Sequence, residues 1–529
     1  MKILVSDPLS EEGLKILEAS GIPVDVRPGL SEDEICGIIG GYDGLIIRSG
    51  TTVTKKILDA GKKLKVVGRA GVGVDNVDVP YATQKGILVM NTPSANIISA
   101  AEHSLAMIMS LARMIPWAHA SVHKCEWKRS KFTGIELYGK TLGIIGVGRV
   151  GGEIAKRAKA FNMTMIGYDP YLPKDVADSL GVRLTTLDDV LRNSDIMTIH
   201  TPLLPETKNM ISMPQFKMMK KNALLVNVAR GGIVNEDDLY EALKNKVIAG
   251  AAFDVFVDEP LKEKCKLLEL DNLVMTPHLG ASTVEAQEKV SVDIAENVIM
   301  YLRDGVIANA INAPRGQMDP FIAPYIPLAD RLGIFVHQLN GKRPVDKVEV
   351  VCSGELASKN TKMLTLSALI GVLKNIVGDS VNMINAESLA KGKNMKITES
   401  KNADSPVYSN MITVTITSGA DVRTVRGTVF AQKPRLIGID NYSFEIPLDT
   451  DLLFAKYHDK PGVIGSVGKI LGENKINIGQ MTVGRDTEKG LAIMLMGVDH
   501  TVPQALIKKI SDATGFNETK FIELVTNRI

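Results

Sequence analysis

The chain has 529 residues, of which 45% are hydrophobic and 23% are charged, a composition typical of a folded globular protein. Its 62 lysines and arginines nearly balance its 60 acidic residues, which excludes the strong overall field that attracts nucleic acid or an anionic membrane surface. The length exceeds what one core holds, so three or four domains of about 100–200 residues are expected.

The cysteine pattern and the first residues indicate the cellular compartment in which the protein is expected. Cys36, Cys125, Cys265 and Cys352 lie far apart, with no pair at the spacing of a zinc site or a disulfide framework. Reduced thiols and no metal site are therefore expected, which favours a cytoplasmic protein. Residues 1–7 have the pattern of a strand and not of a secretory signal, and no apolar run reaches the roughly 18 residues that span a bilayer.

From residue 2 to residue 89, short apolar strands alternate with helical stretches. The predicted strands are 3–6, 44–48, 64–69 and 87–90. This alternation indicates parallel strands in an α/β layer. Residues 99–102, Ser-Ala-Ala-Glu, have the pattern of a capping box before an apolar run to Ile115, which predicts a long helix.

Residues 140–311 repeat the alternation and contain a glycine-rich loop. Six strands, predicted at 141–145, 164–168, 196–200, 224–227, 250–254 and 273–275, form one doubly wound sheet. The first leads into GxGxxG at 146–151, with a helix predicted from Gly152 to Ala160. Gly146 permits the tight turn, Gly148 lets the backbone approach a pyrophosphate, and Gly151 lets helix and strand pack closely. The amides at the helix start then point at the phosphates.

The second strand of this sheet is predicted to end beside an acid, Asp169. A carboxylate at that position bonds the ribose hydroxyls and repels a 2′-phosphate. Pro170 and Tyr171 follow it, so no adjacent arginine receives such a phosphate. The pattern therefore favours NAD over NADP, and the alternative is a plain turn with a surface aspartate.

Three polar residues follow predicted strands of the same sheet: Arg230, Glu259 and His278. Ligands of open parallel sheets bind at the carboxyl ends of the strands, so these side chains are expected to converge. Oxidation of a secondary alcohol needs a base, usually a histidine, which a carboxylate orients. An arginine binds a substrate carboxylate through two parallel hydrogen bonds. Each residue alone more often has a structural role, as an ion pair or on a solvated face, and only the set of three behind a cofactor loop favours catalysis.

These stretches resemble the D-isomer-specific 2-hydroxyacid dehydrogenase family, over about residues 2–314. The resemblance implies an NAD-dependent oxidoreductase in which Arg230, Glu259 and His278 are catalytic. It implies cofactor contacts at Gly146, Gly148, Arg149, Val150, Gly151, Asp169, Thr201, Val228, Ala229, Arg230, Asp254, His278, Leu279, Gly280 and Ala281. It also implies that residues 101–132 form a helix and an arm that cross a dimer interface, so we expect a homodimer or homotetramer.

Two further stretches indicate which hydroxy acid is the substrate. Residues 46–51 and 68–76 are similar to those of the phosphoglycerate dehydrogenases of this family, which implies 3-phosphoglycerate as substrate. A phosphate needs cationic partners and amide donors, here Arg48 and Arg69 with the backbone at Val72 and Gly73. Arg129, in the basic stretch 124–131, either adds charge from a neighbouring subunit or belongs to a solvated face.

The implied reaction is NAD-dependent oxidation of 3-phospho-D-glycerate to 3-phosphohydroxypyruvate, the first step of serine biosynthesis. One alternative is another D-2-hydroxyacid dehydrogenase, acting on glyoxylate, hydroxypyruvate or lactate. A second alternative is a non-catalytic NAD-sensing protein, because such members of the family retain the three catalytic residues.

The pattern changes beyond a predicted boundary at 313–316. Strands are predicted at 347–351 and 411–416, in a segment that resembles the intervening domain, of the allosteric substrate-binding type, in long-form enzymes. The tail is predicted as strand 451–457, helix 463–472, strands 476–483 and 491–498, helix 502–511 and strand 520–525, a ferredoxin-like order.

The tail also resembles an ACT regulatory domain at residues 457–463 and 476–478. The resemblance implies that Tyr457, Asp459 and Asn477 bind an amino acid, with serine as the allosteric ligand. The alternative is a degenerate ACT fold that only dimerises.

We therefore expect an α/β protein with a Rossmann-type NAD domain inserted in a flavodoxin-like substrate domain, followed by the two C-terminal domains. The expected boundaries are 1–96 with 287–313 for substrate, 97–286 for NAD, 314–450 for the intervening domain and 451–529 for the ACT domain.

Overall fold

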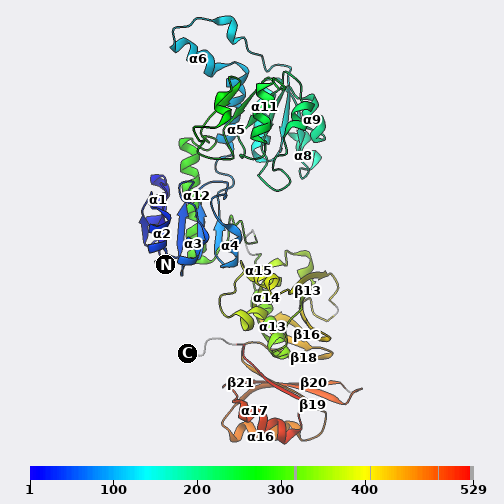
Figure 1. The fold of residues 1–529 in the computed structure, drawn as a ribbon. Helices are drawn as coiled ribbons and strands as arrows, with labels where there is room; N and C mark the ends of the chain where they lie inside the picture. The colour runs from blue at the N-terminus through cyan, green and yellow to red at the C-terminus, as the bar shows by residue number, and fades with distance from the viewer. Residues whose placement is uncertain (315–318, 406, 487, 525–529) are drawn as a thin grey trace.

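A computed structural model describes residues 1–314, 319–405, 407–486 and 488–524. Four sheets follow one another along an elongated molecule, with the NAD lobe at one end and the ACT domain at the other (Figure 1). The predicted boundary at 313–316 includes Arg315 and Gly316, which lie outside the described residues, as does Val525 of the last predicted strand.

The first sheet has the flavodoxin-like order β2-β1-β3-β4-β5, with every neighbouring pair parallel. Its strands are β1 (Ile3–Val5), β2 (Val24–Val26), β3 (Gly44–Ile47), β4 (Val66–Arg69) and β5 (Leu88–Met90). The sequence did not predict β2, an edge strand whose central Asp25 interrupts the apolar pattern. Helices α1 (Glu11–Ala19), α2 (Glu32–Ile38), α3 (Lys55–Ala60) and α4 (Val79–Gln84) connect these strands.

Helix α12 (Val284–Asp304) returns the chain from the NAD lobe to this first sheet (Figure 1). A Cβ on Gly68 would lie 2.7 Å from Val298 and 3.0 Å from Ile294, so only glycine lets β4 approach the helix this closely. Ser291 likewise lies against Gly13 of α1. The family resemblance implies that the chain returns to the first domain after the inserted one. Small residues let the returning helix pack closely against that domain.

The second sheet has seven parallel strands in the order β12-β11-β10-β9-β6-β7-β8. They are β6 (Thr141–Ile145), β7 (Thr164–Tyr168), β8 (Arg183–Leu184), β9 (Ile196–Ile199), β10 (Leu224–Asn227), β11 (Gly250–Phe253) and β12 (Leu273–Met275). The predicted six are all present, and the prediction missed β8, a two-residue edge strand too short for any period. Its helices are α7 (Arg149–Ala160), α8 (Lys174–Ser179), α9 (Leu187–Asn193), α10 (Met213–Met218) and α11 (Glu236–Lys244).

The predicted long helix is α5 (Ile97–Ala112), but the predicted capping box is wrong. The helix begins after Asn96, so Ser99 lies in its first turn and bonds another loop. Helix α6 (Ile115–His123) follows after a 62° bend and projects from the NAD lobe (Figure 1). Among the described residues no single helix has the length and apolarity of a membrane span, and only the bent α5–α6 pair meets both measures jointly.

The C-terminal half is built from two largely antiparallel sheets. The six-stranded sheet has the order β14-β13-β15-β16-β17-β18, and the four-stranded sheet the order β20-β21-β19-β22. The first contains β13 (Lys347–Gly354), β14 (Lys396–Asn402), β15 (Asn410–Ser418), β16 (Asp421–Phe430), β17 (Lys433–Ile439) and β18 (Tyr442–Pro447). Helices α13 (Tyr325–Asn340), α14 (Lys362–Val377) and α15 (Ala386–Gly392) belong to it. The prediction found only β13 and β15 of this sheet.

The last domain has the predicted βαββαβ order of a ferredoxin-like fold. It comprises β19 (Leu452–His458), α16 (Val463–Glu473), β20 (Ile478–Asp486), β21 (Leu491–Val498), α17 (Gln504–Thr514) and β22 (Glu518–Ile522). One face of this sheet, including Phe454 and Leu495, shares a single buried core with Val336 and Leu339 of α13. The two C-terminal domains are therefore fused through apolar packing.

Candidate active site

The predicted catalytic histidine and glutamate are in direct contact. His278 Nδ1 lies 2.6 Å from Glu259 Oε2, and the other oxygen of Glu259 accepts the Phe256 amide at 2.9 Å. Burial opposes the ionisation of Glu259, but the bonds from His278 and Phe256 outweigh it and lower the pKa of the carboxyl. The pair leaves the Nε2 atom of His278 available as a base, with half of the side chain (49%) exposed.

Arg230 follows β10 and reaches the first sheet's lobe. Its Nε lies 3.2 Å from the Asp75 carboxylate, and a Cβ on Gly73 would lie 2.3 Å from its Nη2. On the other side, a Cβ on Gly231 would lie 2.0 Å from the carbonyl oxygen of Phe256, whose amide binds Glu259. The loops that carry Arg230 and Glu259 therefore pack together where the two lobes meet.

Two more predicted arginines lie near Arg230. Burial, followed by repulsion from Arg230 and Arg48, lowers the pKa of Arg69 to about 10, although Asp75 opposes the shift. The Nε of Arg69 is buried and finds no hydrogen-bond partner within the described ranges. Three guanidinium groups held close together with so little compensation form a site that attracts an anion.

The loop beneath these arginines has backbone geometry that only glycine permits. Gly71 has φ of +151°, and a Cβ there would lie 1.7 Å from Arg69 Nη1. The predicted amide donors at Val72 and Gly73 follow directly, and the Asn91 side chain donates to the Val72 carbonyl. The predicted substrate residues Arg48, Arg69, Val72 and Gly73 are thus brought to one edge of the first sheet.

The glycine-rich loop has the geometry that a dinucleotide requires. Gly146 has φ of +88°, and a Cβ on Gly151 would lie 2.2 Å from the Gly146 carbonyl oxygen. A Cβ on Gly148 would meet nothing within 4 Å, so open space lies over the start of α7. A cavity of about 540 Å³ covers this point and is lined by Val147, Gly148, Arg149, Ser94 and Leu172, among others. The residues present therefore fit an NAD pyrophosphate at the start of the helix.

The cofactor site continues at the ends of the neighbouring strands. Asp169 Oδ2 accepts the Val147 amide at 3.0 Å, which fixes the carboxylate beside the glycine turn. The methyl group of Thr201 lies next to Gly146. The hydroxyl of Thr201 is buried and has no hydrogen-bond partner in the part of the chain that the structure describes. An unpaired buried hydroxyl is costly, so this atom fits a ligand contact. The prediction began α7 at Gly152, and the structure begins it at Arg149, directly after the loop.

The remaining predicted cofactor residues surround the carboxyl ends of β10, β11 and β12. Val228 lies against Gly280, and Asp254 accepts the amides of Leu279 and Gly280. Asp254 itself is fully buried, so its side chain binds the surrounding loop. Ala229 and Ala281 belong to the same segments, whereas Val150 lies in the first turn of α7. Arg149 binds the Pro93 carbonyl and the Ser94 hydroxyl, which lie just before α5.

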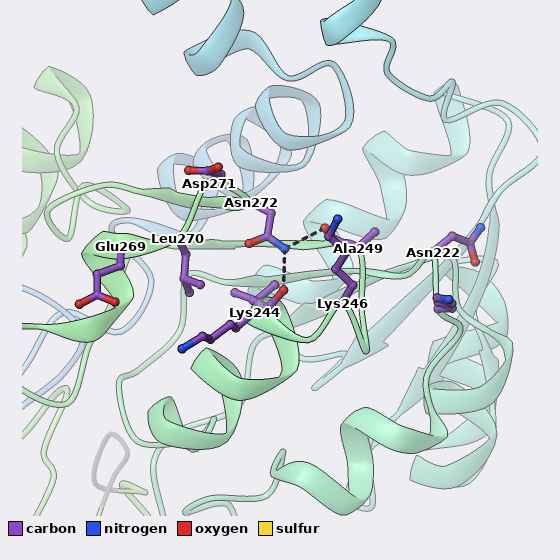
Figure 2. Close-up of a pocket in the computed structure, with 10 residues that line it drawn as sticks. Asn222, Lys244, Lys246, Ala249, Glu269, Leu270, Asp271 and Asn272 are labelled. Carbon is purple, nitrogen blue, oxygen red and sulfur yellow. Dashed lines mark hydrogen bonds between the residues drawn. The ribbon is translucent and has the colours of Figure 1, made fainter.

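A larger cavity, of about 750 Å³, lies elsewhere in the NAD lobe (Figure 2). It is lined by Asn222, Lys246, Ala249 and Asn272, which precede β10, β11 and β12. These are the amino ends of the strands, whereas ligands of doubly wound sheets bind at the carboxyl ends. The cavity is therefore separate from the catalytic residues.

The predicted regulatory residues are placed differently from the catalytic ones. The Asp459 carboxylate is bound by Arg485 at 2.6 Å, and Asn477 donates to Asp499 at 2.9 Å. The ring of Tyr457 is 3% exposed and packs on Phe516, so it lies in the domain core and not at the loop surface.

Arg129 lies on the exposed arm after α6, in a short 3₁₀ turn at Arg129–Phe132. Its side chain is exposed, and a contact with a neighbouring subunit stays a prediction.

Sequence reasoning missed two residues of the site. Asp75 pairs with Arg230, and His103 of α5 lies 3.1 Å from Asp254. The helical spacing of Ser99 and His103 was the one available signal, because it places both on one face of α5.

Comparison with known proteins identifies the family. The NAD-binding domain of the D-isomer-specific 2-hydroxyacid dehydrogenases matches residues 105–280, the D-3-phosphoglycerate dehydrogenase intervening domain matches 321–440, and the ACT domain matches 452–515. A D-3-phosphoglycerate dehydrogenase of Methanocaldococcus jannaschii is 44% identical over 528 residues, which cover 99% of this chain and 100% of that protein. The chain belongs to the D-3-phosphoglycerate dehydrogenase family.

Other relatives agree. A D-3-phosphoglycerate dehydrogenase of Bacillus subtilis is 40% identical, and the alignment covers 99% of this chain and 99% of that protein. Among solved structures, the TT0316 protein of Thermus thermophilus is 32% identical with a TM-score of 0.54, and a D-lactate dehydrogenase of Aquifex aeolicus, in complex with NAD and lactic acid, is 27% identical with a TM-score of 0.53. Each alignment covers 59% of this chain and 100% of the solved chain. The protein is an NAD-dependent oxidoreductase, and NAD is its cofactor.

Proposed function

We propose that the protein oxidises carbon 2 of 3-phospho-D-glycerate to give 3-phosphohydroxypyruvate, with NAD as oxidant, as the first step of serine synthesis. The observation that carries the proposal is the arginine cluster, Arg48, Arg69 and Arg230, which lies where the two lobes meet near the His278–Glu259 pair. Asp75 is the carboxylate paired with this cluster, and a substrate with a carboxylate and a phosphate supplies the further negative charge that three guanidinium groups attract.

The chain's own residues divide the work as follows. His278 accepts the hydroxyl proton at Nε2, while Glu259 holds Nδ1 and stabilises the imidazolium that forms. Arg230 binds the substrate carboxylate and polarises the reacting oxygen. Arg48 and Arg69, with the amides at Val72 and Gly73, bind the phosphate. Bound NAD supplies the acceptor for the hydride that leaves carbon 2.

Closure of the two lobes completes the site. The chain crosses between them near Asn96 and near Glu285, and hinge motion at these points excludes water from the reacting atoms. The contact of Arg230 with Asp75 and with the Gly73 loop already joins the lobes. The proposed domains are 1–96 with 287–313, 97–286, 314–450 and 451–529.

Assembly, regulation and location belong to the same proposal. Helix α6 and the segment that follows it carry exposed apolar side chains, among them Ile115 (51%) and Trp127 (80%), which supports a dimer or tetramer. The ACT domain suggests an amino acid as allosteric ligand, and we take it to be serine, held near Asp459 and Asn477. A cytoplasmic location fits the cysteine pattern.

A substrate panel tests the proposal. Full-length protein with NAD is expected to form NADH faster with 3-phosphoglycerate than with lactate, and serine is expected to slow the reaction. In the reverse assay, in which NADH is consumed, the reduction of glyoxylate or hydroxypyruvate is expected to be slower than the oxidation of 3-phosphoglycerate. A preference for lactate or for the reduction of glyoxylate would support the first alternative, and no turnover with any acid would support the NAD-sensing alternative.

A further inference from the structure

One face of α5 contacts the loop that carries the catalytic histidine. Ser99, His103 and Met107 follow one another at a spacing of four residues, so they share that face. Ser99 Oγ donates to the Gly280 carbonyl at 2.9 Å, and His103 Nε2 lies 3.1 Å from Asp254 Oδ1 and 3.2 Å from Thr276 Oγ1. The helix therefore binds residues on both sides of His278.

Asp254 connects this helix face to His278. Its two carboxylate oxygens accept the amides of Leu279 and Gly280 at 2.7 and 2.9 Å, and its backbone carbonyl accepts the His278 amide at 2.9 Å. His278 itself has φ of +56°, a left-handed conformation that is unfavourable for a non-glycine residue. The surrounding bonds must therefore hold the turn in place.

The carboxylate is charged in spite of its position. Asp254 is fully buried, which opposes ionisation, but hydrogen bonds from His103, Thr276 and the Leu279 amide outweigh this and lower its pKa. The side chain of His103 is 18% exposed. Among the described residues, it is the one basic side chain within 4 Å of this carboxylate.

We infer that His103, supported by Ser99, is a positioning residue that acts through Asp254 to hold His278 in its reactive orientation. Because α5 begins at the crossing between the lobes, the same face links closure to the orientation of the base. Loss of His103 leaves Asp254 with Thr276 and two amides as donors, so the fold persists while the turn loosens. This inference rests on the proposed function for its kinetic test only.

The test compares His103→Leu with His103→Gln and with Glu102→Gln, a control on the exposed side of the same helix, where Glu102 contacts only Arg157 in the described chain. In full-length protein, His103→Leu is expected to lower kcat about 10- to 100-fold through misplacement of the base, with the KM for NAD changed less than about threefold. His103→Gln, which retains a donor at a similar reach, is expected to recover most of kcat.

A second readout does not need turnover. The rate at which diethyl pyrocarbonate modifies His278, followed by mass spectrometry, is expected to rise several-fold in His103→Leu and to match the wild type in Glu102→Gln. A kcat and a modification rate in His103→Leu equal to those of the control would overturn the inference. If His103→Leu does not fold, the same two measurements are made on Ser99→Ala, for which a smaller loss of kcat is expected. Unchanged kcat and an unchanged modification rate in Ser99→Ala would then overturn the inference.

The outcomes separate the two proposals. Wild-type protein that forms no NADH with any hydroxy acid contradicts the proposed function, while the modification rate still decides whether His103 positions His278.

Discussion

The two halves of the molecule carry their function in different ways. In residues 1–314, polar side chains from separate segments converge at the carboxyl ends of parallel strands, and they meet across the junction of two lobes. In residues 319–524, two largely antiparallel sheets share one apolar core, and Asp459 and Asn477, which were predicted for regulation, bind Arg485 and Asp499 of the same domain. In the first half, the sheet topology alone brings the polar residues of the proposed site together. In the second half, side-chain packing determines whether the predicted residues can face a ligand.

The contrast has a physical cause. A parallel α/β sheet leaves its carboxyl edge open, so residues that follow the strands have freedom to face a ligand. In the C-terminal half, Asp459 is engaged by Arg485, and Tyr457 is part of the core. A ligand there must displace existing contacts, whereas in the arginine cluster of the first half the buried Nε of Arg69 has no hydrogen-bond partner among the described residues.

The largest effect is expected at the catalytic base. His278→Asn removes the proton acceptor while it keeps a polar side chain, so kcat is expected to fall about 10²- to 10⁴-fold. NAD affinity is expected to stay near the wild-type value, because the glycine loop and Asp169 are untouched. Steady-state kinetics and NADH titration measure the two quantities. Near-normal turnover would remove His278 from its assigned role.

An intermediate effect is expected in the arginine cluster. Arg69→Gln removes a buried charge whose Nε has no protein partner within the described ranges, so the KM for 3-phosphoglycerate is expected to rise about 10- to 100-fold. The matched control is Arg27→Gln, an exposed position in the same lobe. Equal KM values for the two variants would show that Arg69 does not bind the substrate.

The smallest effect is expected where the two halves touch. Asn382 Nδ2 donates to the Gly86 carbonyl at 2.9 Å, and Ile384 packs in the core of the first sheet. Asn382→Ala is expected to weaken inhibition by serine about threefold, with uninhibited kcat unchanged. Asn360→Ala, an exposed asparagine of the same domain, serves as control. Serine titrations that are identical for both variants would exclude this contact as the coupling element.

The sequence predicted the elements of the catalytic half well, because apolar strands buried on both faces are conspicuous. Every predicted strand of the second sheet is present, and the short or polar edge strands β2 and β8 were missed. The intervening sheet was mostly missed, because β14 and β16 are polar on their exposed faces and have no continuous apolar run.

The candidate site shows the same limit. Arg230, Glu259 and His278 follow strands and were predicted from motifs, and the structure joins the last two directly. Asp75 and His103 were missed, because their partners Arg230 and Asp254 lie more than one hundred residues away in the chain. Ser99 was misread as a cap, since its real partner is the Gly280 carbonyl. Contacts between segments so far apart in the chain are set by the tertiary fold, and no local sequence pattern contains them.

The most direct test of the account is the preference for a phosphorylated hydroxy acid. The ratio of kcat/KM for 3-phospho-D-glycerate to that for D-glycerate, measured with the full-length protein and NAD, isolates the contribution of the phosphate. The arginine cluster predicts a ratio of at least about 100. A ratio near one would contradict the assignment of Arg48 and Arg69 and, with it, the proposed substrate.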